Sequence, residues 1–331
     1  MTEPATTRLS FEVPRELAGF RLDRFLTDLL PDRSRSAISR LVGDGRVTVG
    51  EERATKAGFA LKGGEVVHVD MPDAPSEVDN LGEDIPLTIV YRDAHLVVID
   101  KPSGLVVHPA PGHATGTLVN ALIHWAKEED VALDIDDEVR PGLAHRIDKD
   151  TSGLIVVAFD DQTLRGLQAQ FAAHTIERVY RAVVLGKNLT ETGRIETFYG
   201  RHPKDRKRYT GRLETAARKA VTHWTVITRG FTLALVECRL ETGRTHQIRV
   251  HMSEHGYPIV ADPIYGHTLS RSSAGSDTAR MNRELLAART MPRLALHAAV
   301  LGFVHPITGE KLRFESPDPA DFAGLVKALG A

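Results

Sequence analysis

The sequence predicts an α+β protein, in which a mixed, mainly antiparallel sheet forms the main domain and a small domain of two helices and a hairpin precedes it. Two observations predict this class. Short β-rich runs recur after residue 86 with helical stretches between only some of them, which favours an α+β domain over a doubly wound one. Before residue 77, apolar residues first follow helical spacing and then alternate as in a hairpin.

The small domain is expected to contain two helices followed by a hairpin. Apolar residues recur at helical spacing over 22–30, and the sequence PDRS at 31–34 ends that helix and supplies a cap for a second helix at about 34–42. A strand-like run at 46–49 and an alternating run at 65–69 complete the hairpin.

An acidic stretch divides the chain. Residues 71–86 hold three prolines and five acids but no cation, a composition that is typical of an interdomain linker. We therefore expect an N-terminal segment at 1–17, a small domain at 18–76, a linker at 77–86 and a large domain at 87–331.

The large domain is expected to be built mainly from strands. Two stretches, 117–127 and 161–174, have helical character, and 268–290 is rich in Ser, Arg and Ala, which indicates a mobile insertion. The segment 245–251 is expected to be extended. The other expected strands are 87–91, 96–99, 154–157, 182–185 and 232–236.

Composition excludes several classes of protein. The chain has 331 residues and a single cysteine, Cys238, which excludes an intrachain disulfide and a multi-thiolate metal site. No stretch reaches the ~20 apolar residues of a membrane span, and residues 1–10 lack the apolar core of a signal peptide, so we expect a cytoplasmic protein. No phosphate-cradling glycine motif and no histidine spacing of a metal site occurs, so neither a cofactor nor a metal is expected.

The net charge of −2 conceals two basic clusters. Residues 201–219 carry eight cations against two acids, a local net of +6, and the second predicted helix and its exit carry four arginines against Asp44. A solvated helix face and a surface for a polyanion both fit the second cluster. The cations are Arg201, Lys204, Arg206, Lys207, Arg208, Arg212, Arg218 and Lys219 in the first cluster, and Arg33, Arg35, Arg40 and Arg46 in the second.

The segment 145–153, HRIDKDTSG, places two acids among basic and hydroxyl side chains directly before an apolar strand. Catalytic groups often lie on loops that enter a rigid sheet. From the pattern alone, however, a polar turn in which Asp148 or Asp150 bonds nearby backbone amides is the more common explanation.

Ordered motifs across the chain resemble those of the RluA-type ribosomal large-subunit pseudouridine synthases, and the arrangement is closest to their RluD-like branch. The segment 145–153 resembles the nucleophile motif, with Ile147 in place of the usual leucine, and 241–252, ETGRTHQIRVHM, resembles the arginine motif. Residues 21–49 resemble an S4 RNA-binding domain. Further segments that agree in order are 100–109, 178–182, 262–266 and 296–298.

The resemblance implies an enzyme that isomerises uridine to pseudouridine without a cofactor. It implies Asp148 as the nucleophile and Tyr180 as the residue that stacks on the uracil, while Arg249 would hold the charge of Asp148 through two parallel hydrogen bonds. If 245–251 is extended, Arg249 shares a face with Gln247 and His251. The target uridine must leave its stack, and Arg146 would fill the space that it vacates.

The implied partner is structured RNA, either large-subunit ribosomal RNA or a pre-ribosomal particle, bound by a monomer, and the target uridine would lie in a stem-loop. Three alternatives stay open: a non-catalytic S4-domain ribosome-assembly factor, a same-family synthase that acts on tRNA, and an aspartate-dependent glycoside hydrolase. The sequence leaves open which uridines are modified, and whether Asp148 attacks C1′, attacks C6 or assists deprotonation at C2′. The expected RNA contacts are Arg146, His145, Arg33, Arg35, Arg40, Lys204, Arg206, Lys207 and Arg208.

Overall fold

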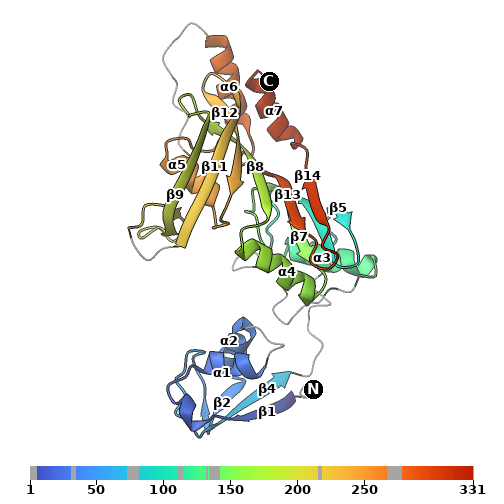
Figure 1. Ribbon diagram of the computed structural model, residues 1–331, viewed down its shortest axis with the longest axis vertical. Coiled ribbons are helices and arrows are strands. Elements are labelled where there is room, and N and C mark those ends of the chain that lie inside the picture. The colour runs from blue at the N-terminus through green and yellow to red at the C-terminus, as the bar shows by residue number, and fades with distance from the viewer. Residues whose placement is uncertain are drawn as a thin grey trace. The chain divides into compact units, whose positions relative to one another are not determined.

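The computed structural model describes residues 6–30, 35–72, 82–109, 115–131, 133, 142–214, 218–266 and 278–330. The chain divides into two compact units (Figure 1). The first contains the described residues up to Gly82, and the second contains those from Glu83 onward.

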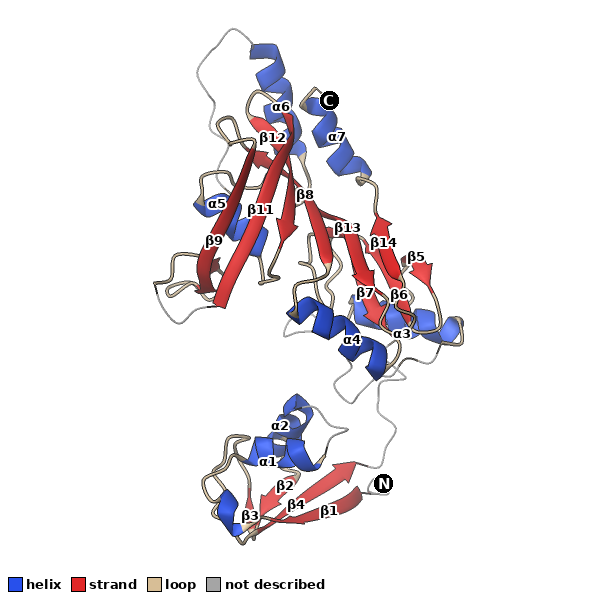
Figure 2. Cartoon of the chain, viewed as in Figure 1, coloured by secondary structure: helices blue, strands red, loops and turns tan. Residues whose placement is uncertain are grey.

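The first unit packs two helices against a four-stranded antiparallel sheet (Figure 2). Leu22 and Leu26 of one helix and Ile38 of the other are fully buried against the sheet, which explains the helical spacing of apolar residues in the sequence. The predicted helices and hairpin strands are present. The elements are β1 (Thr6–Glu12), the short 3-10 helix η1 (Arg15–Leu17), α1 (Leu22–Leu29), α2 (Arg35–Gly43), β2 (Val47–Val49), β3 (Glu52–Arg53) and β4 (Val66–Pro72), with strand order β1-β4-β2-β3.

Strand β1 differs from the expectation, because it lies within residues 1–17, which we expected to form a segment outside the small domain. It pairs with β4 from Thr6↔Pro72 to Glu12↔Val66 and so belongs to the same sheet. Only Leu9 and Phe11 of β1 pack on the core, and both are partly exposed. Two apolar positions on an edge strand give too short an alternation to predict a strand.

The second unit is built on a ten-stranded sheet in the order β10-β9-β11-β12-β8-β13-β7-β6-β5, with β14 paired to β13. The pairing of β13 with β7 is parallel, and the others are antiparallel. The mixed, mainly antiparallel sheet that the sequence predicts is therefore confirmed. The strands are β5 (Thr88–Arg92), β6 (Leu96–Lys101), β7 (Ser152–Ala158), β8 (Glu177–Leu185), β9 (Thr192–Arg201), β10 (Tyr209–Thr210), β11 (Arg218–Arg229), β12 (Leu233–Leu240), β13 (Leu296–Val304) and β14 (Lys311–Glu315).

Two helices of this unit lie where the sequence predicts them. In α3 (Leu118–Glu128), the Thr117 side chain and Asn120 form a capping box, and in α4 (Asp161–Ala172) the Asp160 carboxylate accepts from the Thr163 N–H at 2.7 Å. The C-terminal helix α7 (Ala320–Ala328) follows Pro319. These caps fix where the two helices begin after β6 and β7.

The expected mobile insertion is wrong over its second half, because residues 278–290 form the helix α6 (Thr278–Thr290). Its Glu284 is fully buried, and the carboxylate accepts from the backbone N–H groups of Phe231, Thr232 and Leu233 at 2.6, 2.8 and 3.2 Å. These long-range bonds hold a helix whose sequence is polar enough to resemble a loop. Residues 267–277 lie outside the described part of the chain.

The expected extended segment at 245–251 is also wrong, because most of it forms the helix α5 (Gln247–Glu254). All six residues from Gln247 to Met252 are buried, so no polar face reveals the helical period. The helix begins after His246, which has φ 60°, and the Gln247 side chain accepts from the Arg244 N–H at 3.0 Å. Gln247, Arg249 and His251 therefore do not share one face.

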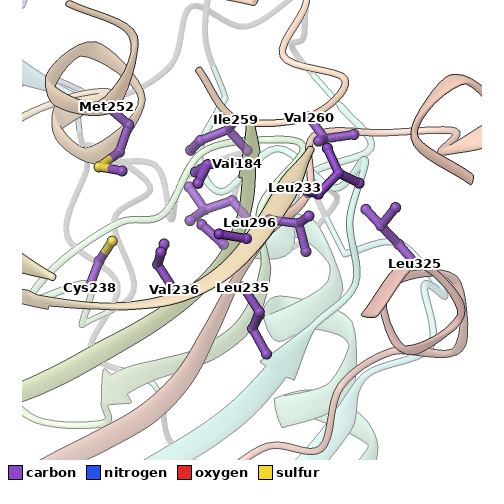
Figure 3. Packing of buried hydrophobic residues seen from close by; sticks show 14 of the residues in the cluster. Val184, Leu233, Leu235, Val236, Cys238, Met252, Ile259, Val260, Leu296 and Leu325 are labelled. Atoms are coloured by element: carbon purple, nitrogen blue, oxygen red, sulfur yellow. The ribbon is translucent and has the colours of Figure 1, made fainter. Parts of the chain in front are cut away.

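A hydrophobic cluster fixes α5 against the sheet. Met252 of α5 packs in the same cluster as Val184 of β8, Cys238 of β12 and Leu325 of α7 (Figure 3). Cys238 is fully buried, as expected for a structural thiol. The cluster joins the helix that carries Arg249 to the strand that carries Tyr180.

Candidate active site

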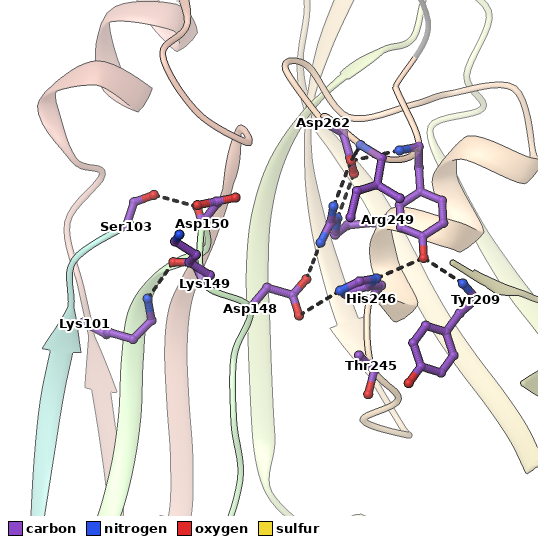
Figure 4. A network of polar contacts seen from close by, with 12 residues as sticks. Lys101, Ser103, Asp148, Lys149, Asp150, Tyr209, Thr245, His246, Arg249 and Asp262 are labelled. Atoms are coloured by element: carbon purple, nitrogen blue, oxygen red, sulfur yellow. Dashed lines mark hydrogen bonds and ion pairs between the residues drawn. The ribbon is translucent and has the colours of Figure 1, made fainter. Parts of the chain in front are cut away.

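The loop that carries Asp148 is tied to the segment that follows β6. The Lys101 ammonium donates to the carbonyl of Lys149 at 3.0 Å, and the Ser103 hydroxyl donates to the carbonyl of Asp150 at 2.8 Å (Figure 4). The Thr151 N–H also bonds the Asp148 carbonyl at 3.1 Å, which closes a turn. The polar-turn and catalytic interpretations of this segment are thus compatible, since the turn uses backbone groups and leaves the Asp148 carboxylate available.

Lys101 is a fully buried lysine whose three hydrogens all have acceptors. Besides Lys149, it bonds the carbonyls of Pro102 and Leu105 at 2.7 and 2.9 Å. Burial lowers the pKa of Lys101 to about 7, although the nearby charges of Asp150 and Asp148 oppose that shift. Lys101 joins the segment that follows β6 to the loop that carries Asp148, a role that the sequence did not indicate.

Asp148 and Asp262 share the guanidinium of Arg249. Arg249 Nη1 donates to Asp148 Oδ2 at 2.9 Å, while Nε and Nη2 donate to Asp262 at 2.8 and 2.9 Å (Figure 4). The expected contact between Arg249 and Asp148 is present, but it is a single hydrogen bond, and the two parallel bonds go to Asp262 instead. Asp262 is the residue of this cluster that the sequence did not indicate as a partner of Arg249.

The two carboxylates that bond Arg249 differ in their burial. Burial lowers the pKa of Arg249, but hydrogen bonds and charges of Asp262 and Asp148 outweigh burial and raise it overall. Burial raises the pKa of Asp262, but its contacts with Arg249 and with the backbone N–H groups of Tyr265 and Ile264 lower it overall. The Asp262 side chain is 1% exposed and that of Asp148 is 18% exposed. Asp262 therefore holds the arginine, and Asp148 is the carboxylate that a substrate can reach.

His246 lies beside Asp148 in a defined orientation. Its Nε2 is 3.9 Å from Asp148 Oδ1, and its Nδ1 is 2.9 Å from the Tyr265 hydroxyl. That hydroxyl accepts from the Tyr209 N–H at 2.9 Å and so can donate its own hydrogen to Nδ1. Burial lowers the pKa of His246, and a neutral ring would then carry its proton on Nε2, which faces Asp148.

Tyr180 lies at the middle of β8, where its backbone pairs with Cys238 of β12 and Ala298 of β13. The side chain is half-buried and faces the same cavity as Asp148. Burial raises the pKa of the Tyr180 hydroxyl to about 12, so the phenol is neutral at physiological pH. This geometry suits a ring that packs on a base and a hydroxyl that donates a hydrogen bond.

A cavity of about 460 Å³ brings Asp148, Tyr180 and Arg249 together with Arg146 and His145. This volume is in the range of sites that bind small ligands. Arg146 is exposed at the cavity. His145, which we expected to contact RNA, accepts from the Val156 N–H at 3.1 Å and stacks on Phe171, and burial lowers its pKa to about 3.

The basic loop between β9 and β10 presents three exposed cations, and a fourth, Arg208, lies against Tyr265. Lys204, Arg206 and Lys207 are exposed, while the Arg208 guanidinium lies 5.2 Å from the centre of the Tyr265 ring. None of the four lines the cavity. Of the expected contacts in the first unit, Arg35 and Arg40 lie on α2, the positions of their side chains are not described, and Arg33 lies outside the described residues.

Two negative findings concern the described residues alone. Within them, no three His, Cys, Asp or Glu side chains are grouped as metal ligands would be. No helix there has both the length and the apolar character needed to cross a bilayer.

Comparison with known proteins agrees with these observations. A family model described as RNA pseudouridylate synthase matches residues 95–254, and an S4 domain model matches residues 20–67. Proteins named ribosomal large subunit pseudouridine synthase D are 41% identical in Zymomonas mobilis, over 95% of this chain and 95% of that protein, and 42% identical in Pseudomonas aeruginosa, over 96% and 94%. The solved human RNA pseudouridylate synthase domain containing 4 is 27% identical, with a TM-score of 0.56, over 73% of this chain and 93% of that one. The chain thus belongs to the RNA pseudouridine synthase family and carries an S4 domain.

Proposed function

We propose that this enzyme isomerises specific uridines of large-subunit ribosomal RNA in a stem-loop. The observation that carries the proposal is the cavity that the accessible Asp148 carboxylate, held by Arg249, lines together with Tyr180. The names of the relatives from Zymomonas mobilis and Pseudomonas aeruginosa support the ribosomal substrate.

The proposed reaction begins when the target uridine leaves its stack and enters the cavity. Flipping costs a few kcal/mol, about 2 to 4, and Arg146 lies exposed at the cavity, where it can occupy the vacated space. The Tyr180 ring then packs on the uracil face. Because RNA supplies most of its affinity through phosphates, the exposed cations of Lys204, Arg206 and Lys207 would grip the surrounding stem.

Asp148 starts the chemistry as an ionised carboxylate that the permanent charge of Arg249 keeps in place. The bond between C1′ and N1 breaks, the base turns, and C5 joins C1′. N1 gains a proton and C5 loses one, so the product has the composition of the substrate. Attack at C1′, attack at C6 and deprotonation at C2′ each require a carboxylate at this position, so the accessible Asp148 is compatible with all three.

Release of tritium from RNA labelled at uracil C5 tests the proposal, because isomerisation exchanges that hydrogen. Wild-type protein should release tritium, and Asp148→Asn should release none while it retains RNA affinity. A non-catalytic assembly factor and a glycoside hydrolase would release none with wild-type protein. Measurable turnover by Asp148→Asn would show that another residue is the nucleophile.

The substrate is tested separately by mapping pseudouridines with carbodiimide-dependent reverse-transcription stops in cells with and without the protein. Stops that disappear from large-subunit ribosomal RNA support the proposal. Stops that disappear only from tRNA would favour the tRNA-modifying alternative. Comparing free RNA with pre-ribosomal particles as substrates then identifies the partner, which we propose is met in the cytoplasm by the monomeric enzyme.

A further inference from the structure

Arg178 is a buried cation that the mechanism above does not use. It lies on β8 two residues before Tyr180, its exposed fraction is 8%, and it lines the same cavity as Asp148. Residues i and i+2 of a strand face the same side and are about 7 Å apart. Arg178 and Tyr180 are therefore neighbours along the cavity wall.

The partners of Arg178 leave its positive charge uncompensated. Nη2 donates to the carbonyl of Glu241 at 3.1 Å, and the guanidinium lies 5.4 Å from the centre of the Phe171 ring. Nε is buried without a hydrogen-bond partner. Among the residues that the structure describes, no carboxylate forms an ion pair with Arg178, whereas the equally buried Arg249 has two.

Gly243 leaves the space that one arm of this guanidinium occupies. A Cβ atom at position 243 would lie 2.5 Å from Arg178 Nη1. Nη1 itself makes no hydrogen bond within the described part of the chain, and Gly243 lines the cavity as well. The absence of a side chain at Gly243 thus leaves room for Arg178 Nη1, but the described residues supply no hydrogen-bond acceptor for this nitrogen.

A buried charge without a counterion is unfavourable, unless a ligand supplies the counterion. The arginine fork matches the oxygens of a phosphate, and a nucleotide carries its phosphates one sugar away from its base. If Tyr180 packs on the uracil, Arg178 lies about 7 Å along β8 from it, within reach of a phosphate of the same nucleotide.

We propose that Arg178 binds a phosphate that flanks the flipped uridine, and that this contact holds the nucleotide while its base turns. The inference rests on the proposed function, because it takes the ligand to be RNA. It adds a substrate-binding residue whose task differs from those of Asp148, Tyr180 and Arg249.

A cycle that combines a protein change with a phosphate change tests the contact directly. The probe is a stem-loop that contains a uridine identified by the mapping experiment, with a neutral methylphosphonate at either its 5′ or its 3′ phosphate. Affinity is measured for full-length protein with Arg178 and for Arg178→Gln. At one of the two positions, the methylphosphonate should weaken RNA binding by the Arg178 protein by about tenfold or more. The same methylphosphonate should leave RNA binding by Arg178→Gln nearly unchanged. Equal effects on both proteins at both phosphates would overturn the proposal.

Stability measurements separate this role from a purely structural one. Because Arg178→Gln removes an uncompensated buried charge, it should melt at or above the wild-type temperature. If Arg178 served only to bond the Glu241 carbonyl and to pack on Phe171, the variant would melt lower, and each methylphosphonate would weaken its binding by the same factor as for the Arg178 protein. Arg178→Lys, which keeps the charge, should retain part of the phosphate sensitivity and covers the case in which Arg178→Gln does not fold.

Arg181→Gln provides a matched control. Arg181 lies on the same strand, but its side chain pairs with Asp318 at 2.6 Å and does not line the cavity. This variant should keep the full methylphosphonate effect, and the same loss of the effect in both variants would refute a specific contact of Arg178. If wild-type protein releases no tritium, the proposed function fails, whereas tritium release with additive phosphate effects refutes the Arg178 contact alone.

Discussion

The two carboxylates that bond Arg249 should differ sharply in what they contribute to stability. In Asp262→Asn, the remaining Oδ1 can still accept from the N–H groups of Ile264 and Tyr265, but the charge that faces two arms of Arg249 is lost. Removing one partner from a buried ion pair typically costs about 3–5 kcal/mol. Because Arg249 keeps its bond to Asp148, we expect the lower end, about 3 kcal/mol.

Asp148→Asn should cost much less, about 1 kcal/mol, because it weakens one hydrogen bond of a side chain that is 18% exposed and leaves Arg249 paired with Asp262. Urea unfolding followed by tryptophan fluorescence measures both values in the second unit, since Trp125 and Trp224 both lie there. An equal loss of stability in the two variants would refute the division of roles between Asp148 and Asp262.

The pH dependence of the same pair provides an independent check. Because contacts with Arg249 lower the pKa of Asp262 below its ordinary value of 3.8 against the opposing effect of burial, folding favours the ionised form. The resulting stability is present above pH 3.8 and is lost as the pH falls through the lower pKa of the folded protein. The stability difference between wild type and Asp262→Asn should therefore be constant near neutral pH and shrink below pH 3.8. A difference that grows with acid would contradict this sign.

Three further variants test the surroundings of the site. Lys101→Met removes a donor from three carbonyls, of which that of Lys149 still accepts from the Gly104 N–H, so we expect a loss of about 3 kcal/mol in unfolding free energy and slower tritium release, with RNA affinity unchanged. Glu284→Gln should lower the melting temperature, because it weakens the bonds to three backbone N–H groups, and normal tritium release by the folded variant is expected. Replacing Lys204, Arg206 and Lys207 by Gln should reduce the slope of log affinity against log salt by about 0.7 to 0.9 for each phosphate that these cations neutralise, and an unchanged slope would exclude the loop from RNA binding.

The sequence predicts elements that are marked by a continuous apolar run or by a clear cap, and it fails where neither signal is present. Strand β6 is such a run and helix α3 begins at a capping box, and both occur where expected. Helix α5 is buried over Gln247–Met252, so its sequence carries no amphipathic period. Helix α6 is held in place by the Glu284 carboxylate. The N–H groups that this carboxylate bonds lie more than 50 residues earlier in the sequence. Local patterns do not contain that information.

The same limit applies to the site. Asp148, Tyr180 and Arg249 lie in one cavity, as the ordered motifs suggested, but the pairing within the site depends on backbone geometry. Ala261 has φ 56° and His246 has φ 60°, conformations that are uncommon for residues other than glycine. Ala261 precedes Asp262, and His246 precedes α5. The two turns allow the Asp262 carboxylate to reach Arg249, which lies 13 residues earlier in the sequence. The motif DPIYG at 262–266 was the only signal in the sequence that could have indicated Asp262.

The hydrogen bonding of the site separates support from function. Lys101 and Asp262 have their polar atoms occupied by the protein, so they can fix the positions of neighbouring groups but offer nothing further to a ligand. Tyr180 and Arg178 face the cavity with polar atoms for which the described residues supply no partner. A buried polar group that lacks a hydrogen-bond partner destabilises the free protein. This cost is removed when a bound substrate supplies the partner. Substitutions of Lys101 and Asp262 should therefore act mainly on the stability of the protein, whereas substitutions of Tyr180 and Arg178 should act mainly on the binding of the nucleotide.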